Sequence, residues 1–232
     1  MVIKVKGKLI VIEGTDCSGK ETQTKKIVEE CKKKGITIYN YSFPRYDTPT
    51  GKIVGGPYLG KSYICDGWFQ EGAAAVDALV ASAYYAADRR YNIKEIKDHL
   101  EKGDIVLLDR YVESNMAHQG GKLETKEERQ KMYEKLDELE FGIMELPRPD
   151  AVIFLYMPFE YAAILKRSRE ESADQHESNK SHLEKAERAY LELTEKYNYI
   201  KIDCVKDDVI RTIDDINKEV MERFLSVIDE HR

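Results

Sequence analysis

The chain of 232 residues contains only four cysteines and one tryptophan, and it has no long hydrophobic run. No two cysteines form a CxxC pair, so we expect neither a zinc site nor a disulfide framework, and we expect a reducing, cytoplasmic setting. The longest apolar stretches, such as 9–12 and 151–156, are far shorter than the roughly 18 residues that a membrane span requires. The lysine-rich N-terminus lacks the apolar segment of a signal peptide. We therefore expect no membrane association.

An excess of positive charge is also absent. The 37 lysines and arginines are outnumbered by 43 aspartates and glutamates, which gives a formal net charge of −6. This balance argues against a general nucleic-acid-coating protein, so we expect no nucleic-acid partner. It does not exclude a small anionic ligand, because a few basic side chains in one cleft bind phosphate whatever the total charge. Internal repeats and low-complexity linkers are missing as well, which favours one domain over residues 1–232.

Short apolar runs alternate with helical segments along the chain. The predicted strands are 9–12, 36–43, 105–108, 151–156 and 199–203. The predicted helices are 20–34, 76–100, 125–146, 159–169, 178–197 and 207–228. Strands that are apolar throughout indicate a parallel sheet with helices on both faces, so we expect a three-layer α/β/α fold with five parallel strands. Ligands of such sheets bind beyond the carboxyl ends of the strands.

Two segments depart from this alternation. Residues 46–72 are rich in glycine, proline and tyrosine, and we expect loops with one short helix there. Residues 168–180 are strongly polar, and we interpret the region around 166–180 as a mobile lid.

The first strand ends in a glycine-rich turn that matches G-x-x-x-x-G-K and opens a helix. Glycines let backbone N–H groups turn toward a phosphate, and the helix N-terminus adds positive potential. The context predicts a phosphate loop that binds ATP, with Lys20 on the β- and γ-phosphates, although an ordinary tight turn between strand and helix is the alternative. The residues of the predicted loop are Gly14, Thr15, Asp16, Cys17, Ser18, Gly19, Lys20, Glu21 and Thr22.

Glu21 stands where this motif has a serine or threonine that binds Mg²⁺. Either Glu21 coordinates the metal directly or through water, or nucleotide binding persists with weak catalysis. We prefer the first interpretation.

Several other polar side chains follow strands or share a helix face. Asp109 and Arg110 end the third predicted strand, where an aspartate can serve a metal ion and an arginine can grip phosphate, or where the two can simply form an ion pair. Arg45 follows the second strand. Tyr85 and Arg89 lie four residues apart on one helix and can hold a base and a phosphate, unless the tyrosine belongs to the core.

Taken together, these pieces resemble the thymidylate kinase family of nucleoside monophosphate kinases. The resemblance covers roughly residues 8–203 and rests on the order and spacing of six motifs. They are E-G-T-D-x-S-G-K-x-T-Q at 13–23, F-P-R-Y at 43–46, A-D-R at 87–89, D-R-Y-x-x-S-N at 109–115, L-P-x-P-D at 146–150 and D-Q-H-E at 174–177.

The resemblance implies a role for each matching residue. Asp16 bonds the 3′-hydroxyl of the acceptor sugar and Lys20 holds the donor phosphates. Asp109 serves Mg²⁺ or orients the acceptor phosphate. Tyr85 takes the place of the aromatic side chain that stacks on thymine. The remaining acceptor ligands are Arg45, Arg89 and Arg110 on the monophosphate and Ser114 and Asn115 on the base.

Two features are specific to this chain. Family members take a catalytic arginine from the phosphate loop or from the lid, and because the loop here has none, Arg167 and Arg169 are the candidates. His118 stands where members usually have a tyrosine or phenylalanine against the sugar, which leaves the choice of sugar and base open.

The leading hypothesis is an ATP:dTMP phosphotransferase that uses Mg²⁺ and produces dTDP. One alternative is a related nucleotide kinase with another acceptor, and a second is a nucleotide-binding switch without turnover. The resemblance also implies a homodimer, for which the helix 76–100 could supply the surface.

Overall fold

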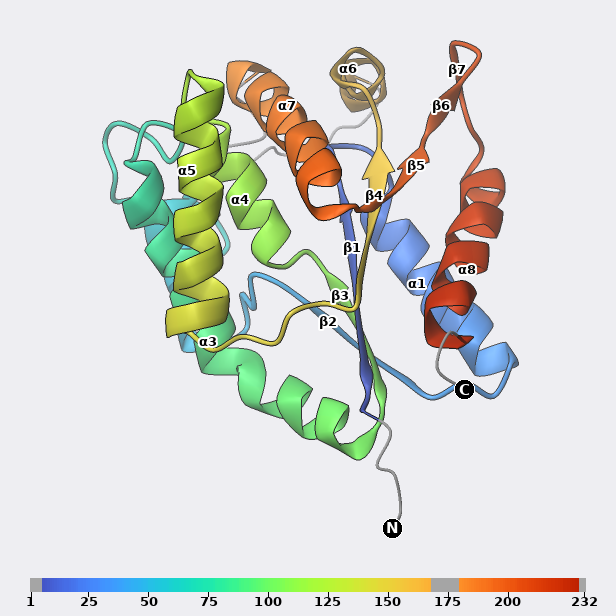
Figure 1. Cartoon of the computed structure of the whole chain (residues 1–232). Coiled ribbons are helices and arrows are strands. Elements are labelled where there is room, and N and C mark those ends of the chain that lie inside the picture. The colour runs from blue at the N-terminus through green and yellow to red at the C-terminus, as the bar shows by residue number, and fades with distance from the viewer. Residues whose placement is uncertain (1–5, 168–179, 230–232) are drawn as a thin grey trace.

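The computed structural model describes residues 6–167 and 180–229. Its centre is a five-stranded parallel sheet with the strand order β2-β3-β1-β4-β5 (Figure 1). The strands are β1 (Lys8–Gly14), β2 (Ile38–Ser42), β3 (Ile105–Asp109), β4 (Ala151–Tyr156) and β5 (Ile200–Asp203). The predicted sheet is therefore confirmed, with β1 at its centre.

Helices cover both faces of the sheet, which makes the three predicted layers (Figure 1). One face packs against α1 (Lys20–Lys33), α6 (Phe159–Arg167) and α8 (Ile213–Asp229). The other packs against α3 (Ala78–Lys102), α4 (Val112–Gly120), α5 (Lys126–Asp137) and α7 (Lys180–Tyr197).

Alternate residues of each strand belong to the two halves of the core. Leu9 and Val11 of β1 pack on the α3 side, whereas Ile10 and Ile12 pack on the α1 side. All four side chains are 0–1% exposed. Because successive side chains of a strand point to opposite faces, a strand between two helical layers must be apolar throughout. This explains the uninterrupted apolar run at 9–12.

Helix α5 is shorter than the sequence predicts. It begins with a capping box between Thr125 and Glu128 and ends at Asp137, where the chain continues as a π-helix, η2 (Glu138–Ile143). The loop region around 46–72 contains α2 (Pro49–Ile53) and a second π-helix, η1 (Val54–Tyr58).

Two elements differ from the sequence expectation. Helix α4 was not predicted at all. The last helix was expected from residue 207, but a short hairpin of β6 (Val205–Lys206) and β7 (Val209–Ile210) precedes it. Asp207 and Asp208 at its tip have φ angles of 50° and 59°. Two left-handed residues are what a tight two-residue hairpin requires, so the helix begins later.

Within the described parts of the chain, no helix has the length and apolar character needed to cross a membrane. The core of the predicted lid, including Arg169 and the D-Q-H-E motif, lies outside the described residues.

Candidate active site

The phosphate loop joins β1 to α1 at the carboxyl end of the sheet. Cys17 and Gly19 adopt left-handed backbone angles, with φ of 55° and 80°, and α1 begins at Lys20. Gly14 ends the strand, and a Cβ atom there would lie 2.7 Å from the carbonyl oxygen of Leu155 on β4. The close passage of two strands therefore requires glycine at position 14.

Thr15 fastens the loop to the end of β4. Its hydroxyl donates to the carbonyl oxygen of Met157 at 2.7 Å and accepts from the backbone N–H of Met157 at 2.9 Å. The Oγ atom of Ser18 is buried and has no hydrogen-bond partner among the described residues. A phosphate oxygen in the loop would give this hydroxyl an acceptor.

Lys20 is folded back onto its own loop. Its Nζ donates to the carbonyl oxygens of Gly14 at 2.9 Å and Thr15 at 3.0 Å. Burial, reinforced by the nearby charge of Arg110, lowers the pKa of Lys20 to about 8. A bound triphosphate would replace both the lost solvation and the carbonyl contacts with a stronger, charge-assisted partner.

A buried carboxylate, Glu13, ties the end of β1 to the elements beside the phosphate loop. Its Oε1 accepts from the backbone N–H groups of Tyr111 at 2.9 Å and Ser114 at 3.0 Å. Its Oε2 accepts from the hydroxyls of Ser114 and Tyr190, both at 2.8 Å. Glu13 therefore joins β1 to α4 and α7. The sequence motif at 13–23 includes Glu13 but does not indicate this role.

A cavity of about 150 Å³ opens beside the phosphate loop. It brings together most of the predicted acceptor residues, although they come from three separate parts of the chain, and we call it the acceptor cavity after them. The predicted residues in its wall are Asp16, Tyr85, Arg89, Arg110, Ser114, Asn115 and His118.

Arg45 is not among the residues that line this cavity, although its neighbours Pro44 and Tyr46 are. Its guanidinium lies 3.4 Å from Asp47, and its backbone N–H donates to Asp88 at 2.8 Å. To reach a phosphate in the cavity, Arg45 would have to leave Asp47.

Arg89 forms a buried, two-pronged ion pair with Glu140. Its Nε lies 2.7 Å from Glu140 Oε2, and its Nη2 donates to Oε1. The two side chains are 3% and 0% exposed. Asn115 adds a third donor to the same carboxylate at 2.7 Å. Glu140 lies on η2, 51 residues from Arg89, and sequence reasoning missed it.

Two side-chain amides are left with unused hydrogen-bonding atoms at this cavity. Gln119 is fully buried, and neither its Oε1 nor its Nε2 has a partner in the described part of the chain. The Oδ1 of Asn115 is in the same condition. An unpaired amide in the interior costs free energy, because its hydrogen bonds to water are lost. These two amides therefore point to a ligand with donors and acceptors on its edge. No sequence motif identifies Gln119 as a ligand-binding residue.

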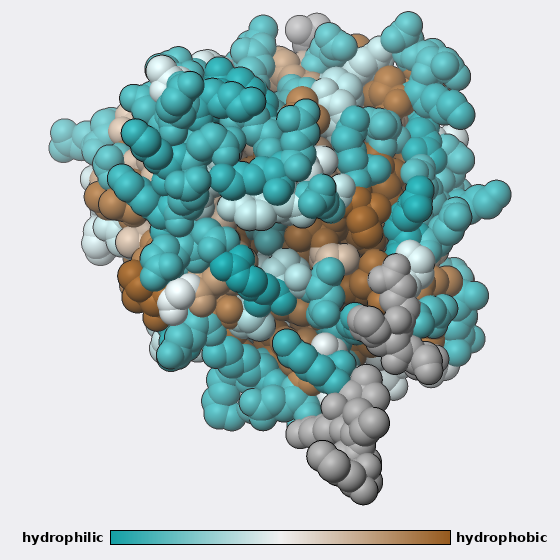
Figure 2. Space-filling view, in the orientation of Figure 1, coloured by the Kyte–Doolittle hydropathy of each residue, from teal (hydrophilic) through white to brown (hydrophobic). Residues whose placement is uncertain are grey.

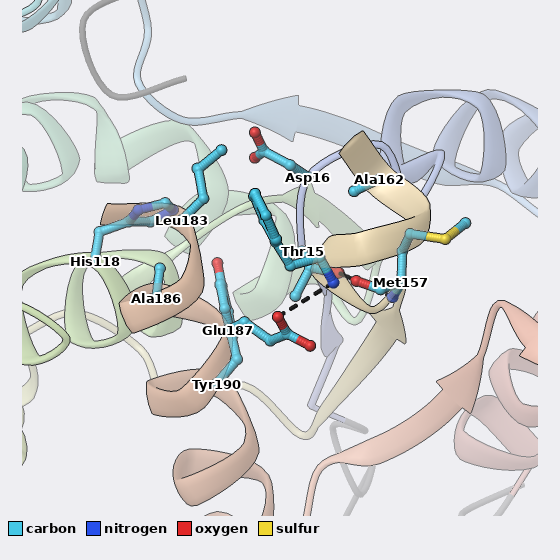
Figure 3. A pocket seen from close by; sticks show the side chains of 11 residues that line it. Thr15, Asp16, His118, Met157, Ala162, Leu183, Ala186, Glu187 and Tyr190 are labelled. Carbon is cyan, nitrogen blue, oxygen red and sulfur yellow. Dashed lines mark hydrogen bonds between the residues drawn. The ribbon is translucent and has the colours of Figure 1, made fainter. Parts of the chain in front are cut away.

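His118 connects the acceptor cavity to α7. Its Nδ1 lies 3.2 Å from Nε2 of His182, and the two rings are stacked with centroids 5.3 Å apart. His118 and Asp16 also line a smaller pocket between the phosphate loop and helices α6 and α7 (Figure 3). Across this pocket, Glu187 accepts from the backbone N–H of Phe159 at 3.2 Å.

The residues suited to Mg²⁺ are few. In residues 6–167 and 180–229, no group of three His, Cys, Asp or Glu side chains could hold a metal ion. Mg²⁺ bound with nucleotide phosphates needs only one or two carboxylates, and Asp109 has a buried Oδ1 without a partner in those residues. Glu21 is 76% exposed and lies 2.5 Å from Lys25, so it would bind metal only by releasing that lysine. The carboxyl of Asp109 has an oxygen that no described residue occupies, so it is the better candidate of the two.

A phosphate loop at the central strand of a parallel sheet, with a second polar cavity beside it, defines a P-loop protein built to hold two phosphate-bearing ligands. The profile of the family described as "Thymidylate kinase" matches residues 12–214. The chain therefore belongs to the thymidylate kinase family, and the resemblance of its motifs is confirmed.

Known relatives cover nearly the whole chain. The probable thymidylate kinase of Thermococcus onnurineus is 32% identical over 219 residues, covering 91% of this chain and 94% of its own. The thymidylate kinase of Plasmodium falciparum is 29% identical over 224 residues, covering 97% and 92%. A solved thymidylate kinase structure from Candida albicans superposes with a TM-score of 0.70 over 95% of this chain and 92% of that one, and at 23% identity it supports the fold.

These findings confirm the predicted fold and the phosphotransferase, and the switch without turnover is not favoured. The chain is a nucleotide kinase with ATP as phosphate donor.

Proposed function

We propose that this chain transfers the γ-phosphate of ATP to dTMP through the residues of the two adjoining sites. The observation that carries the proposal is the position of Asp16 and Arg110. Both line the acceptor cavity, while Asp16 belongs to the phosphate loop itself and Arg110 lies close enough to lower the pKa of Lys20. A phosphate in the cavity therefore lies next to the donor phosphates.

On the donor side, residues 14–22 would hold the phosphates of ATP with backbone N–H groups, and Lys20 would carry the positive charge to them. Phosphoryl transfer needs little covalent help from the protein, so positioning and charge neutralisation supply most of the rate. Lys20 already lies inside the loop, and a modest side-chain rotation away from two carbonyl oxygens frees all three of its N–H donors.

On the acceptor side, we assign the monophosphate to Arg110, with Arg45 joining it if Asp47 is released. The charge of Arg89 is neutralised by Glu140. We therefore assign Arg89 the role of a hydrogen-bond donor that also fixes the inner wall of the cavity. Asp16 would accept from the sugar hydroxyl, and His118 would pack beside the sugar.

We assign the base to the aromatic ring of Tyr85 and to the amides of α4. Tyr85 is braced by an edge-on contact with Tyr58, with ring centroids 5.7 Å apart. Asn115 and Gln119 then offer the unpaired acceptors and donors that a pyrimidine edge requires. Ser114 is occupied by Glu13, Arg110 and Tyr190, so it would orient these groups and not read the base alone.

For the metal, we propose Asp109 as the carboxylate that holds Mg²⁺ or its water, with Glu21 as a second candidate. Bound Mg²⁺ would neutralise charge on the β- and γ-phosphates. Arg167 and Arg169 remain candidates for the catalytic arginine that contacts the phosphoryl group during transfer. Arg167 is the last residue of α6, and Arg169 lies outside the described residues.

We further propose a cytoplasmic homodimer. All four cysteines are free thiols, which suits a reducing compartment. Leu79 and Val80, near the start of α3, are each 47% exposed, and Ile143 of η2 is 68% exposed. Large apolar side chains of this kind favour a protein interface. A Leu79→Glu, Val80→Glu variant should elute as a monomer with light-scattering detection, whereas an unaltered dimer would rule this surface out.

A coupled ADP-release assay with ATP and Mg²⁺ tests the activity. We expect dTMP to react fastest among dTMP, dUMP, UMP, dCMP, dGMP and AMP, and Arg110→Ala to raise the acceptor KM at least tenfold. Turnover of another acceptor in preference to dTMP would mean that Asn115, Gln119 and His118 select a different base or sugar. Absence of turnover with every acceptor, despite ATP binding, would overturn the proposal.

A further inference from the structure

A second cavity, of about 470 Å³, lies at the opposite end of the sheet from the acceptor cavity. Its wall includes Lys8, Ala151 and Ile200, which begin β1, β4 and β5, together with residues of α4, α8 and the end of α7. None of the residues that line it also lines the acceptor cavity. Its volume falls within the range of roughly 300–1,000 Å³ that small-molecule sites occupy.

The end of α7, the start of β4 and helix α8, which contribute to the wall of this cavity, lie toward the viewer in Figure 1. Figure 2 shows hydrophobic atoms near the middle of this face, framed by hydrophilic ones. The established reaction has no use for a cavity at this end, because both phosphate sites lie at the carboxyl ends of the strands.

The most unusual residue of its wall is Glu113, at the start of α4. Glu113 is 4% exposed, and its Oε2 is buried without a hydrogen-bond partner in the described chain. Burial, with a smaller contribution from the charge of Glu13, raises the pKa of Glu113 to about 8. The raised pKa favours the protonated carboxyl, in which one oxygen carries an O–H donor and the other is a carbonyl-type acceptor. Such a pair matches the N–H and C=O groups of a lactam.

The rest of the wall combines aromatic rings with one unbalanced cation. Tyr197 and Tyr199 stack nearly parallel, with an interplanar angle of 15°. Arg148 is held by Asp137 at 2.5 Å, and Lys8 is paired with Asp150 at 3.5 Å. The last cation of the wall is Arg223.

Arg223 lies on α8 and forms no ion pair within residues 6–167 and 180–229. With Glu113 protonated, Arg223 leaves the cavity with one net positive charge. The wall thus offers flat apolar surface, a neutral donor–acceptor pair and one cation that is not neutralised.

We propose that this cavity is a second ligand site that takes a planar heterocycle carrying a lactam edge and one anionic group. The lactam edge pairs with the carboxyl of Glu113, the ring lies along the two tyrosines, and the anion binds Arg223. The proposal does not depend on which nucleotide the kinase accepts.

Helix α4 separates this site from the acceptor cavity. Ser114, Asn115, His118 and Gln119 line the acceptor cavity, whereas Glu113 and Met116 line the second one. The two sets follow the spacing of opposite helix faces. A ligand that draws Glu113 toward it pulls on the turn whose backbone N–H at Ser114 is bound to Glu13, so occupancy should change the KM for the acceptor.

Orotate, a pyrimidine lactam with a carboxylate and no sugar or phosphate, is a suitable probe. Titration calorimetry on the full chain with saturating dTMP should show one orotate site, because the acceptor cavity is then filled. Glu113→Leu and Arg223→Ala should each weaken binding at least tenfold. Glu113→Gln, which keeps a neutral donor and acceptor, should stay within threefold, and so should Lys218→Ala on the exposed face of α8, the matched control.

The pH dependence provides a second test. Orotate binding should fall as pH rises through about 8, because ionisation of Glu113 removes its donor and places a negative charge beside the ligand. In Glu113→Gln this fall should disappear. The proposal is wrong if dTMP displaces orotate completely, or if no binding occurs at millimolar orotate. It is also wrong if Arg223→Ala, a change at an exposed helical position, leaves the affinity unaltered.

Discussion

Replacement of Glu140 by alanine should destabilise the protein far more than loss of an ordinary ion pair. Glu140 is fully buried and neutralises Arg89, which is itself 3% exposed, and it also accepts from Asn115. Glu140→Ala leaves a guanidinium in the interior with a single weak contact to the Tyr111 carbonyl at 3.3 Å.

The size of the effect follows from burial. Breaking a buried pair by removing one partner costs about 3–5 kcal/mol, because the remaining charge stays desolvated. A folded domain has only about 5–15 kcal/mol of total stability, so Glu140→Ala should remove a large part of it. Replacing both members, as in Arg89→Met with Glu140→Leu, should restore most of the loss, because no buried charge then remains.

Urea unfolding at pH 7, followed by far-UV circular dichroism, measures these differences. Asp98→Ala is the matched control, since Asp98 pairs with Lys94 at 2.6 Å on the surface, with side-chain exposures of 46% and 85%. That change should cost at most about 0.5 kcal/mol. Equal midpoints for Glu140→Ala and Asp98→Ala would refute the reasoning, as would a double variant less stable than Glu140→Ala.

Glu140→Gln separates stability from function. It removes the charge but keeps an oxygen for Arg89 and Asn115, so more of the protein remains folded. The freed guanidinium should shift within the acceptor cavity, so the acceptor KM should rise severalfold while the KM for ATP stays constant. A change in both KM values would mean that the pair supports the whole fold and not the acceptor cavity.

Three further predictions concern the donor and acceptor sites. ATP binding should be accompanied by proton uptake that rises from about half a proton at pH 8 to close to one at pH 9, because phosphate restores the depressed pKa of Lys20. Calorimetry in buffers of different ionisation enthalpy measures this uptake, and Lys20→Met should abolish it. In steady-state kinetics, Asp109→Asn should lower kcat at least a hundredfold and raise the Mg²⁺ concentration needed for activity. Glu21→Ala should change both quantities less than threefold. The reverse pattern would identify Glu21 as the metal ligand. His182→Ala should raise the acceptor KM about three- to tenfold, because His118 loses the ring that holds it. His182→Gln should bring the acceptor KM part of the way back. Equal acceptor KM values in His182→Ala and the unaltered enzyme would contradict a positioning role.

The sheet and the phosphate loop could be predicted because their signals are local. Each strand is an unbroken apolar run, since both faces of the sheet are covered, and the loop must combine glycines with a following helix. The acceptor cavity was predicted only through its resemblance to a family. Its walls come from distant segments, and no local pattern places Tyr85 beside His118.

The partners that hold the site residues could not be predicted at all. Arg89 and Glu140 are 51 residues apart, and His118 and His182 are 64 residues apart. Nothing in the sequence near Arg89 or His118 identifies its partner, because each pairing depends on how η2 and α7 pack against α3 and α4. The hairpin at 205–210 was missed for a different reason: two consecutive aspartates in the left-handed region are an uncommon turn signal, and an acidic segment before an apolar helix resembles a helix start.

Helix α4 shows how much information remained unused in the sequence. The segment S-N-x-x-H-Q places polar side chains at i, i+1, i+4 and i+5, which is one face of a helix, and Glu113 and Met116 fall on another. The face with Ser114, Asn115, His118 and Gln119 lines the acceptor cavity. On the other face Met116 packs into the apolar core with Val112 and Ala117, so Glu113 is a lone carboxyl among apolar side chains. A ligand in the second cavity would give this buried, unpaired carboxyl the partner that the described chain does not supply.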